Sequence, residues 1–239
     1  MLFVVGARIG WASRPRPAPI TLEGVILGID TSIGTAVAVI EPDGVVRAQL
    51  DSGDPRGHAE VIGDHVARVL AESEITSADV THVAAGMGPG PFTGLRVGIA
   101  AARAFALGRG IPLIPVVSHD AVALDRMLMA AMTGADEERF AVVTDARRRE
   151  FAFTVYEGLD DDGLPVRVAD PALAPRDELD AALAAHGARR LDAGSVPAAM
   201  LALAAGRAVA AGRRIAADNA LYLRSPDVTA PTAPKRVIA

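Results

Sequence analysis

The residues with the clearest potential for chemistry lie in a short polar turn that follows an apolar run. Asp30, Thr31 and Ser32 come directly after VILGI and place a carboxylate and two hydroxyls at the end of a predicted strand. Such a turn can hold a phosphate or a hydrated metal beside exposed backbone N–H groups. The alternative is that Asp30 and Ser32 only satisfy the hydrogen-bonding groups of the turn itself. Taken alone, the turn favours this structural interpretation.

A glycine-rich stretch, GPGPFTGLR, spans residues 88–96 and leads into a predicted helix. Gly88 and Gly90 allow the backbone to approach a ligand closely, and the helix start near Thr93 presents N–H groups without helical partners, so a phosphate could bind there. The stretch has neither the Gly-Lys-Ser/Thr of a P-loop nor the spacing of a dinucleotide-binding motif. A tightly packed helix start explains the pattern equally well, and both interpretations stay open.

The sequence contains no complete set of catalytic or metal-binding residues. It has no cysteine, which excludes a thiol nucleophile, a disulfide framework and a zinc ribbon. His58 and His65 lie on one predicted helix but about 10 Å apart, too far to bind one ion, and no HExxH or HxxxH pattern occurs. We therefore expect no catalytic residue and no metal site. The arginines 147–149 could touch RNA phosphates, although the solvated edge of a hairpin is the favoured interpretation.

Composition indicates a globular chain without general affinity for polyanions. Of its 239 residues 51% are hydrophobic, enough for a large core, and the net charge of −5 gives no attraction to nucleic acid or to an anionic membrane. No apolar run is long enough to span a membrane. The absence of cysteine fits a cytoplasmic location. Residues 1–24 contain three prolines at alternate positions and predict a poorly ordered extension.

The order of predicted elements is typical of an α/β fold with two lobes. In the first lobe, residues 25–133, three antiparallel strands precede alternating helices and strands. The strands are expected at 25–30, 34–40, 45–50, 80–86 and 111–117, and the helices at 57–72, 93–107 and 121–131. A shortened second lobe, 134–225, is expected to contain strands at 140–144 and 150–156 and helices at 176–185 and 196–210, before a proline-rich tail at 226–239.

The first two helices also predict a surface for another protein. The second is apolar almost all the way round and rich in small residues, so more than one of its sides must be covered. The candidate interface residues are Val61, Ile62, His65, Val66 and Val69 on the first helix and Gly98 and Ala102 on the second. Complete burial within the chain itself is the alternative.

Several segments together resemble the TsaB (YeaZ) family of tRNA threonylcarbamoyladenosine biosynthesis proteins. They are ILGIDTS, HAEVI, GPGPFTGLRVG, TDARRREFAFTVYE and LYLRSPDVTAP, and the resemblance extends from Val25 to Pro231. Pro91 departs from the serine usual in the family, which removes a hydroxyl and an N–H donor and weakens the case for phosphate binding at the glycine-rich stretch.

The resemblance implies an actin/Hsp70/sugar-kinase-like (ASKHA) fold and a supporting role. Asp30, Thr31 and Ser32 would be what is left of a first phosphate loop, which leaves weak binding of ATP or ADP open. The implied partner is a TsaD-like catalytic subunit, which carries an HxxxH metal site and modifies the adenosine beside the anticodon. A TsaE-like ATPase is a further implied partner, the chain could form a homodimer when alone, and tRNA would be reached only through the complex.

Two other functions compete with the scaffold. A small-molecule kinase or ATPase on the same fold would need a catalytic carboxylate in the cleft and an adenosine-binding glycine motif in the second lobe. A glycoprotease-like peptidase would need a zinc pair, a cysteine or an activated serine, and the sequence offers none of these.

Overall fold

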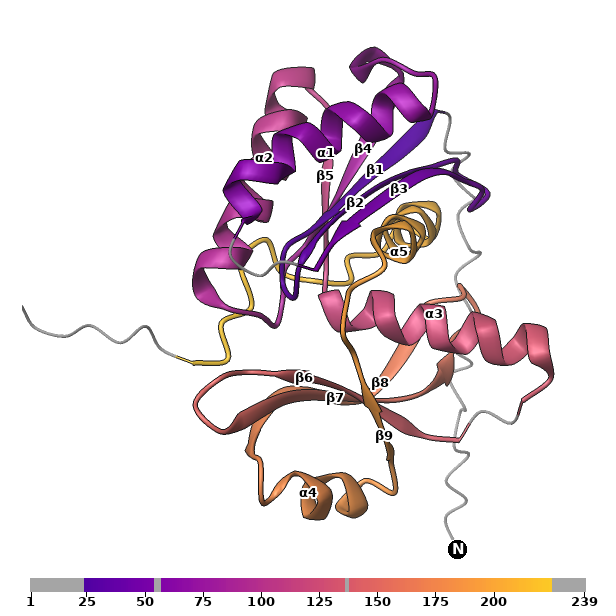
Figure 1. The fold of residues 1–239 in the computed structure, drawn as a ribbon. Helices are drawn as coiled ribbons and strands as arrows, with labels where there is room; N and C mark the ends of the chain where they lie inside the picture. Colours follow the sequence, from indigo (N-terminus) through magenta and orange to yellow (C-terminus); the bar gives the residue numbers. More distant parts are fainter. Residues whose placement is uncertain (1–23, 54–56, 136–137, 225–239) are drawn as a thin grey trace, which may run out of the picture.

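The structure, a computed structural model, describes residues 24–53, 57–135 and 138–224 as two lobes, each built on one sheet (Figure 1). The expected extension at the start of the chain falls almost wholly on residues 1–23 and the expected tail on residues 226–239, so both predictions lie outside the described residues. In the described parts of the chain no helix is both long and apolar enough to cross a membrane.

The first sheet has the strand order β3-β2-β1-β4-β5. Its strands are β1 (Val25–Asp30), β2 (Thr35–Ile40), β3 (Val46–Ser52), β4 (Val80–Gly86) and β5 (Leu113–Val116), and its helices are α1 (His58–Glu72), α2 (Phe92–Arg109) and α3 (Ser118–Thr133), with a 3-10 turn at Ser77–Asp79. The first three strands are antiparallel, whereas β4 and β5 run parallel to β1. The predicted α/β class is therefore confirmed.

Both faces of this sheet are covered, since every position of the central strands β1 and β2 is buried and most of their side chains are apolar. Successive side chains of a strand point to opposite faces. In β1, Leu27 and Ile29 pack with residues of α1 and α2, whereas Ile26 packs with residues of α5 (Ala198–Ala210). Gly28 lies under α5 as well, and a Cβ there would come 2.4 Å from the carbonyl oxygen of Ala198.

The second sheet has the order β8-β7-β6-β9 and is covered by the short helix α4 (Leu179–Ala185) on one face. Its strands are β6 (Phe140–Asp145), β7 (Glu150–Leu159), β8 (Pro165–Pro175) and β9 (Arg189–Asp192). We predicted β6 and β7 but neither β8 nor β9. β8 contains three prolines and lies at the sheet edge, where a missing N–H is tolerated, and β9 is four mostly charged residues.

Two helices connect the lobes. Figure 1 shows α3 lying between the two sheets and α5 returning to the first sheet after the chain has completed the second. The buried side chains of α3 divide accordingly: Leu124 packs with the first lobe, and Met127 packs with Tyr156 of β7. Helix α5 was predicted as part of the second lobe, but it forms part of the core of the first lobe.

Candidate functional site

The polar turn after β1 is folded into the protein interior. Asp30, Thr31 and Ser32 are 1%, 1% and 3% exposed. One carboxylate oxygen of Asp30 accepts hydrogen bonds from the backbone N–H of Ser32 at 2.7 Å and from its hydroxyl at 2.5 Å. The other oxygen accepts from the hydroxyl of Ser118, the first residue of α3, at 2.5 Å. The carboxylate therefore links the end of β1 to the start of α3.

Thr31 is joined to helix α2 in an unusual way. Its hydroxyl donates to the carbonyl oxygen of Gly94 at 2.7 Å and accepts the N–H of Gly98 at 3.0 Å. These two backbone groups are four residues apart and would otherwise face each other in the helical hydrogen-bond ladder. The hydroxyl of Thr31 inserts between them, so both of its hydrogen-bonding functions are used inside the protein.

Glycines make this close approach feasible. A Cβ at Gly98 would lie 2.2 Å from the hydroxyl oxygen of Thr31, and one at Gly94 would lie 2.7 Å from the carbonyl oxygen of Thr31. A Cβ at Gly90 would meet the backbone of Ser32 at 2.7 Å. The glycine-rich stretch thus packs directly on the polar turn, and the two predicted phosphate-binding segments are brought together.

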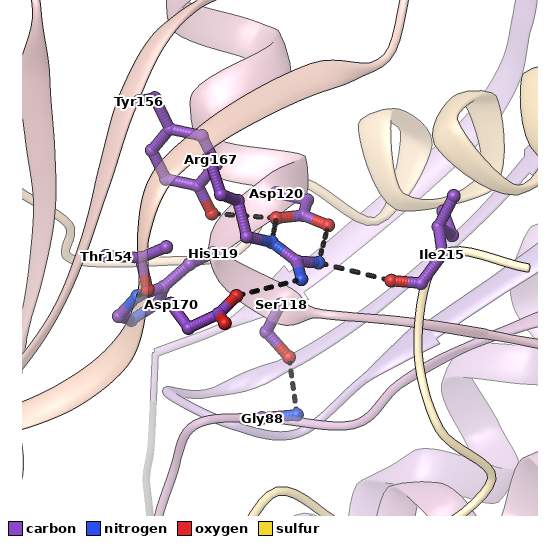
Figure 2. Close-up of polar contacts among 9 residues, drawn as sticks. All are labelled: Gly88, Ser118, His119, Asp120, Thr154, Tyr156, Arg167, Asp170 and Ile215. Carbon is purple, nitrogen blue, oxygen red and sulfur yellow. Dashed lines mark hydrogen bonds and ion pairs between the residues drawn. The ribbon is translucent and has the colours of Figure 1, made fainter.

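Burial also sets the electrostatics of the turn. Desolvation raises the pKa of Asp30, while the hydrogen bonds from Ser118 and Ser32 and the nearby charge of His58 act in the opposite direction. Gly88 completes the arrangement, because its N–H donates to the hydroxyl of Ser118 at 3.0 Å (Figure 2). Of the predicted phosphate-binding residues, Thr93 is the one with an exposed side chain.

A second polar network joins the lobes at the start of α3. Figure 2 shows Asp120 receiving hydrogen bonds from the hydroxyl of Tyr156 on β7 and from Arg167 on β8, the first at 2.8 Å. Arg167 also donates to the carbonyl oxygen of Ile215 at 3.2 Å. Burial raises the pKa of Asp120, and the guanidinium of Arg167 opposes that rise. Four separated segments of the chain therefore share one partly buried ion pair, and no local sequence pattern predicted it.

His119 is enclosed between the same two lobes. Its two ring nitrogens lie 2.8 Å from the hydroxyl of Thr154 and 3.0 Å from that of Thr144, and its side chain is fully buried. Desolvation, assisted by the positive charge of Arg167, lowers the pKa of His119 to about 3. The ring is therefore neutral at physiological pH and serves as a hydrogen-bonded link between α3 and the second sheet.

A cleft of about 720 Å³ opens between the lobes beside the glycine-rich stretch. It is lined by His58, Ala59, residues 89–94, Val97, residues 144–148, Ala152, Leu173 and residues 222–224. The yellow segment of Figure 1 that ends at residue 224 passes between the lobes on this side. There the ring of Tyr222 lies 4.7 Å from that of Phe92, and its hydroxyl accepts from Arg96 at 3.2 Å. The part played by Tyr222 could not be inferred from the sequence.

The turn between β6 and β7 forms one lip of this cleft. Arg147, Arg148 and Arg149 have φ angles of 64°, 52° and 63°, which lie in the left-handed region that residues other than glycine rarely adopt. Each such residue costs roughly 1–2 kcal/mol. Asp145 helps to hold the turn, because its carboxylate accepts the N–H of Arg147 at 2.8 Å.

The histidines do not form a metal site within the described residues, where no group of three or more potential ligands comes together. Nδ1 of His58 lies 2.8 Å from the hydroxyl of Thr35, and His65 is buried on the same helix. On α3, Ala123 stands one turn after His119, so this helix lacks a histidine pair as well.

The predicted interface residues divide into two groups. Ile62, His65, Val69, Gly98 and Ala102 are buried, and they pack toward the sheet or the polar turn. Val61 and Val66 are half-buried. The exposed positions of the two helices include charged residues such as Glu60, Asp64, Arg68 and Arg103, and between them a set of small and apolar residues: Ala59, Gly63 and Ala67 on α1 and Ala100, Ala104 and Leu107 on α2. Leu107 is 85% exposed. We call these six residues the α1–α2 face.

Comparison with known proteins agrees with this architecture. Residues 54–175, from before α1 to the end of β8, match the family model for TsaD, tRNA N6-adenosine threonylcarbamoyltransferase. An uncharacterized protein of Mycobacterium tuberculosis is 40% identical over 167 residues, which cover 68% of this chain and 72% of the relative. The solved structure of YeaZ from Pseudomonas aeruginosa superposes with a TM-score of 0.65 at 27% identity, covering 84% of this chain and 100% of that one.

A curated relative links these matches. The tRNA threonylcarbamoyladenosine biosynthesis protein TsaB of Escherichia coli is 33% identical over 132 residues, covering 55% of this chain and 54% of the relative. The sequence matches and the two-lobed fold point to the same group of proteins. The chain therefore belongs to the TsaB (YeaZ) family.

Proposed function

We propose that this chain is a non-catalytic subunit of the machinery that synthesises threonylcarbamoyladenosine in tRNA, and that it supports a TsaD-like catalytic subunit. The observation that carries the proposal is the state of the polar turn: the functional groups of Asp30, Thr31 and Ser32 are all bonded within the protein. A residue whose oxygens already hold two elements together has little left to offer a substrate.

The α1–α2 face is the surface that we assign to the partner. Its alanines and glycine repeat at intervals of four on each helix, so a second helix can approach the backbone closely. Burial of Leu107 against the partner would favour association, since removing an exposed leucine from water contributes about 1.5–3 kcal/mol. The same face could pair with a second copy of the chain when the catalytic subunit is absent.

A kinase on the same fold is less well supported. A kinase would need a free catalytic carboxylate in the cleft. Among the residues that line the cleft, Asp145 carries the one carboxylate, which accepts hydrogen bonds from Arg176 at 3.0 Å and from the backbone N–H of Arg147. Asp30 lies outside that lining and is buried. Weak binding of ATP or ADP, a contact with a TsaE-like ATPase and a cytoplasmic location remain parts of the proposal that follow from the family.

Capture of the TsaD-like protein from the same organism by the purified chain tests this function. Ala67→Glu and Ala104→Glu each place a charge on the α1–α2 face, and desolvating that charge on association should lower the affinity at least about 10-fold. Ala184→Glu, on the exposed side of α4, is the matched control and should bind as the wild type does. Calorimetry with the purified partner gives the affinities, and circular dichroism checks the folds.

Normal affinity in both face variants would contradict the assigned surface. Formation of threonylcarbamoyladenosine by the isolated chain would contradict the non-catalytic role.

A further inference from the structure

We propose that the turn between β6 and β7, Ala146–Arg149, contacts the phosphodiester backbone of RNA at the mouth of the cleft. The inference rests on the proposed function, and it deepens that function by assigning this subunit a direct contact with the nucleic acid. Arg147 and Arg148 line the cleft, and Arg149 is exposed beside it. Guanidinium groups suit this ligand because they pair with phosphate through two parallel hydrogen bonds.

Hydrogen bonds close the backbone of the turn, so the points from which the three arginine side chains extend are fixed. The N–H of Ala146 donates to the carbonyl oxygen of Glu150 at 3.1 Å, and the N–H of Glu150 donates to that of Arg147 at 3.0 Å. Three consecutive left-handed residues persist in this closed hairpin although glycine would fit each position better. Backbone strain of this kind is a reason to look for a function at the site.

The opposite wall of the cleft supplies an independent observation. The rings of Phe92 and Tyr222 contact each other there at an interplanar angle of 35°, and the guanidinium carbon of Arg96 lies 3.6 Å from the centre of the Phe92 ring. Tyr222 is 38% exposed, so part of its surface is available to a ligand. Aromatic rings beside arginines are typical of surfaces that bind single-stranded nucleic acid, where bases stack on the rings and cations contact the phosphates.

Charge around the turn also favours a polyanion. The acidic residues nearby are already engaged: Asp145 bonds to Arg176, and Glu150 pairs with Arg224. An acidic protein would match the arginines but would have no use for the aromatic wall, and for that reason we assign RNA. A free nucleotide also offers phosphate groups to the arginines, and competition with ATP distinguishes it from RNA.

The decisive variant replaces both Arg147 and Arg149 by glycine. This removes two cations and relieves two strained positions, so the fold is preserved. The melting temperature should rise by about 2–4 °C for each glycine. Replacement of Arg47 and Arg189 by alanine is the control, because these residues form surface ion pairs with Glu41 and Glu138 and lie outside the cleft lining.

Binding of an unmodified tRNA transcript is measured by fluorescence anisotropy between 50 and 200 mM salt, with the chain alone and with its TsaD-like partner. The glycine variant should bind at least about 10-fold more weakly, and its dependence of log K on log salt should be shallower by about 1.5. The control variant should bind as the wild type does, and partner capture should be normal in all three proteins.

The inference is overturned if the glycine variant binds tRNA as the control does. It is also overturned if the wild type binds no tRNA either alone or with its TsaD-like partner. It is also overturned if polyglutamate or ATP competes as well as the transcript, because the ligand would then be an acidic polypeptide or a free nucleotide. Should the chain bind tRNA through this turn but fail to capture the TsaD-like protein, the proposed function fails while the arginine contact stands.

Discussion

At the scale of single residues, hydroxyl groups connect segments that lie far apart in the sequence. Thr31 joins β1 to α2, Ser118 joins α3 to Asp30, and the hydroxyls of Thr144 and Thr154 enclose His119. Each of these bonds is buried. Buried polar groups that lose their partners cost about 1–3 kcal/mol each, so these contacts specify one arrangement of the lobes.

Because His119 is buried, we expect the free energy of unfolding to depend on pH. The pKa of His119 is about 3 in the folded protein, against about 6.5 for an ordinary exposed histidine. Between these values the unfolded chain takes up a proton that the folded chain does not, so this residue removes stability as the pH falls below about 6.5. The expected loss between pH 7 and pH 5 is about 2 kcal/mol.

Urea unfolding of the wild type and of His119→Asn at both pH values measures this loss. The difference in stability between the two proteins should narrow at pH 5, because the variant has no imidazole to protonate. A constant difference would mean that the pKa of His119 is the same in the folded and the unfolded protein.

At the scale of the element, helix α2 shows how one helix uses two glycines differently. Gly98 packs against Thr31, whereas the Cβ position of Gly108 has no atom within 4 Å apart from the neighbouring backbone of its own helix. Gly98→Ala should destabilise the protein by about 1–3 kcal/mol, because the methyl group displaces the inserted hydroxyl. Gly108→Ala in the same helix should stabilise it by about 0.5–1 kcal/mol through helix propensity.

Thermal melts of the two variants provide the comparison. Opposite shifts are expected, and a stabilising effect of Gly98→Ala would show that Thr31 does not insert into the helix.

At the scale of the whole molecule, the lobes depend on each other. Helix α5 completes the first lobe although it follows the second in the chain, and Leu201 on α5 is fully buried in the cluster that contains Ile26. The second lobe is held in turn by α3, through Tyr156 and Met127. We therefore expect both lobes to unfold in one cooperative transition.

Leu201→Ala should lower the free energy of unfolding by about 2–5 kcal/mol, since it leaves a cavity in a closed core. Native-state hydrogen exchange should record the same decrease for amides of β1 and β6. Leu107→Ala, at an exposed position, should change either value by less than about 0.5 kcal/mol. A decrease confined to β1 and its neighbours would show that the lobes unfold separately.

The sequence alone determined the class of fold and most of its elements. The continuous apolar runs of β1 and β2 and the helical spacing in α1 are local patterns, so they could be recognised without tertiary information. For the glycine-rich stretch the sequence left two interpretations open, a close approach to a ligand and a tightly packed helix start, and the structure shows that it packs on the polar turn. β8 and β9 were missed because their prolines and charges obscure the strand pattern.

Tertiary structure decided which surfaces those elements use. The sequence showed that α2 needs cover on several sides, but only the packing showed that Gly98 and Ala102 face inward and that Ala100, Ala104 and Leu107 face solvent. It likewise placed α5 on the first sheet and closed the polar turn against α2. The reason is physical: hydrogen bonds such as that between Thr31 and Gly94 join residues 63 positions apart, and no local pattern encodes such a pairing.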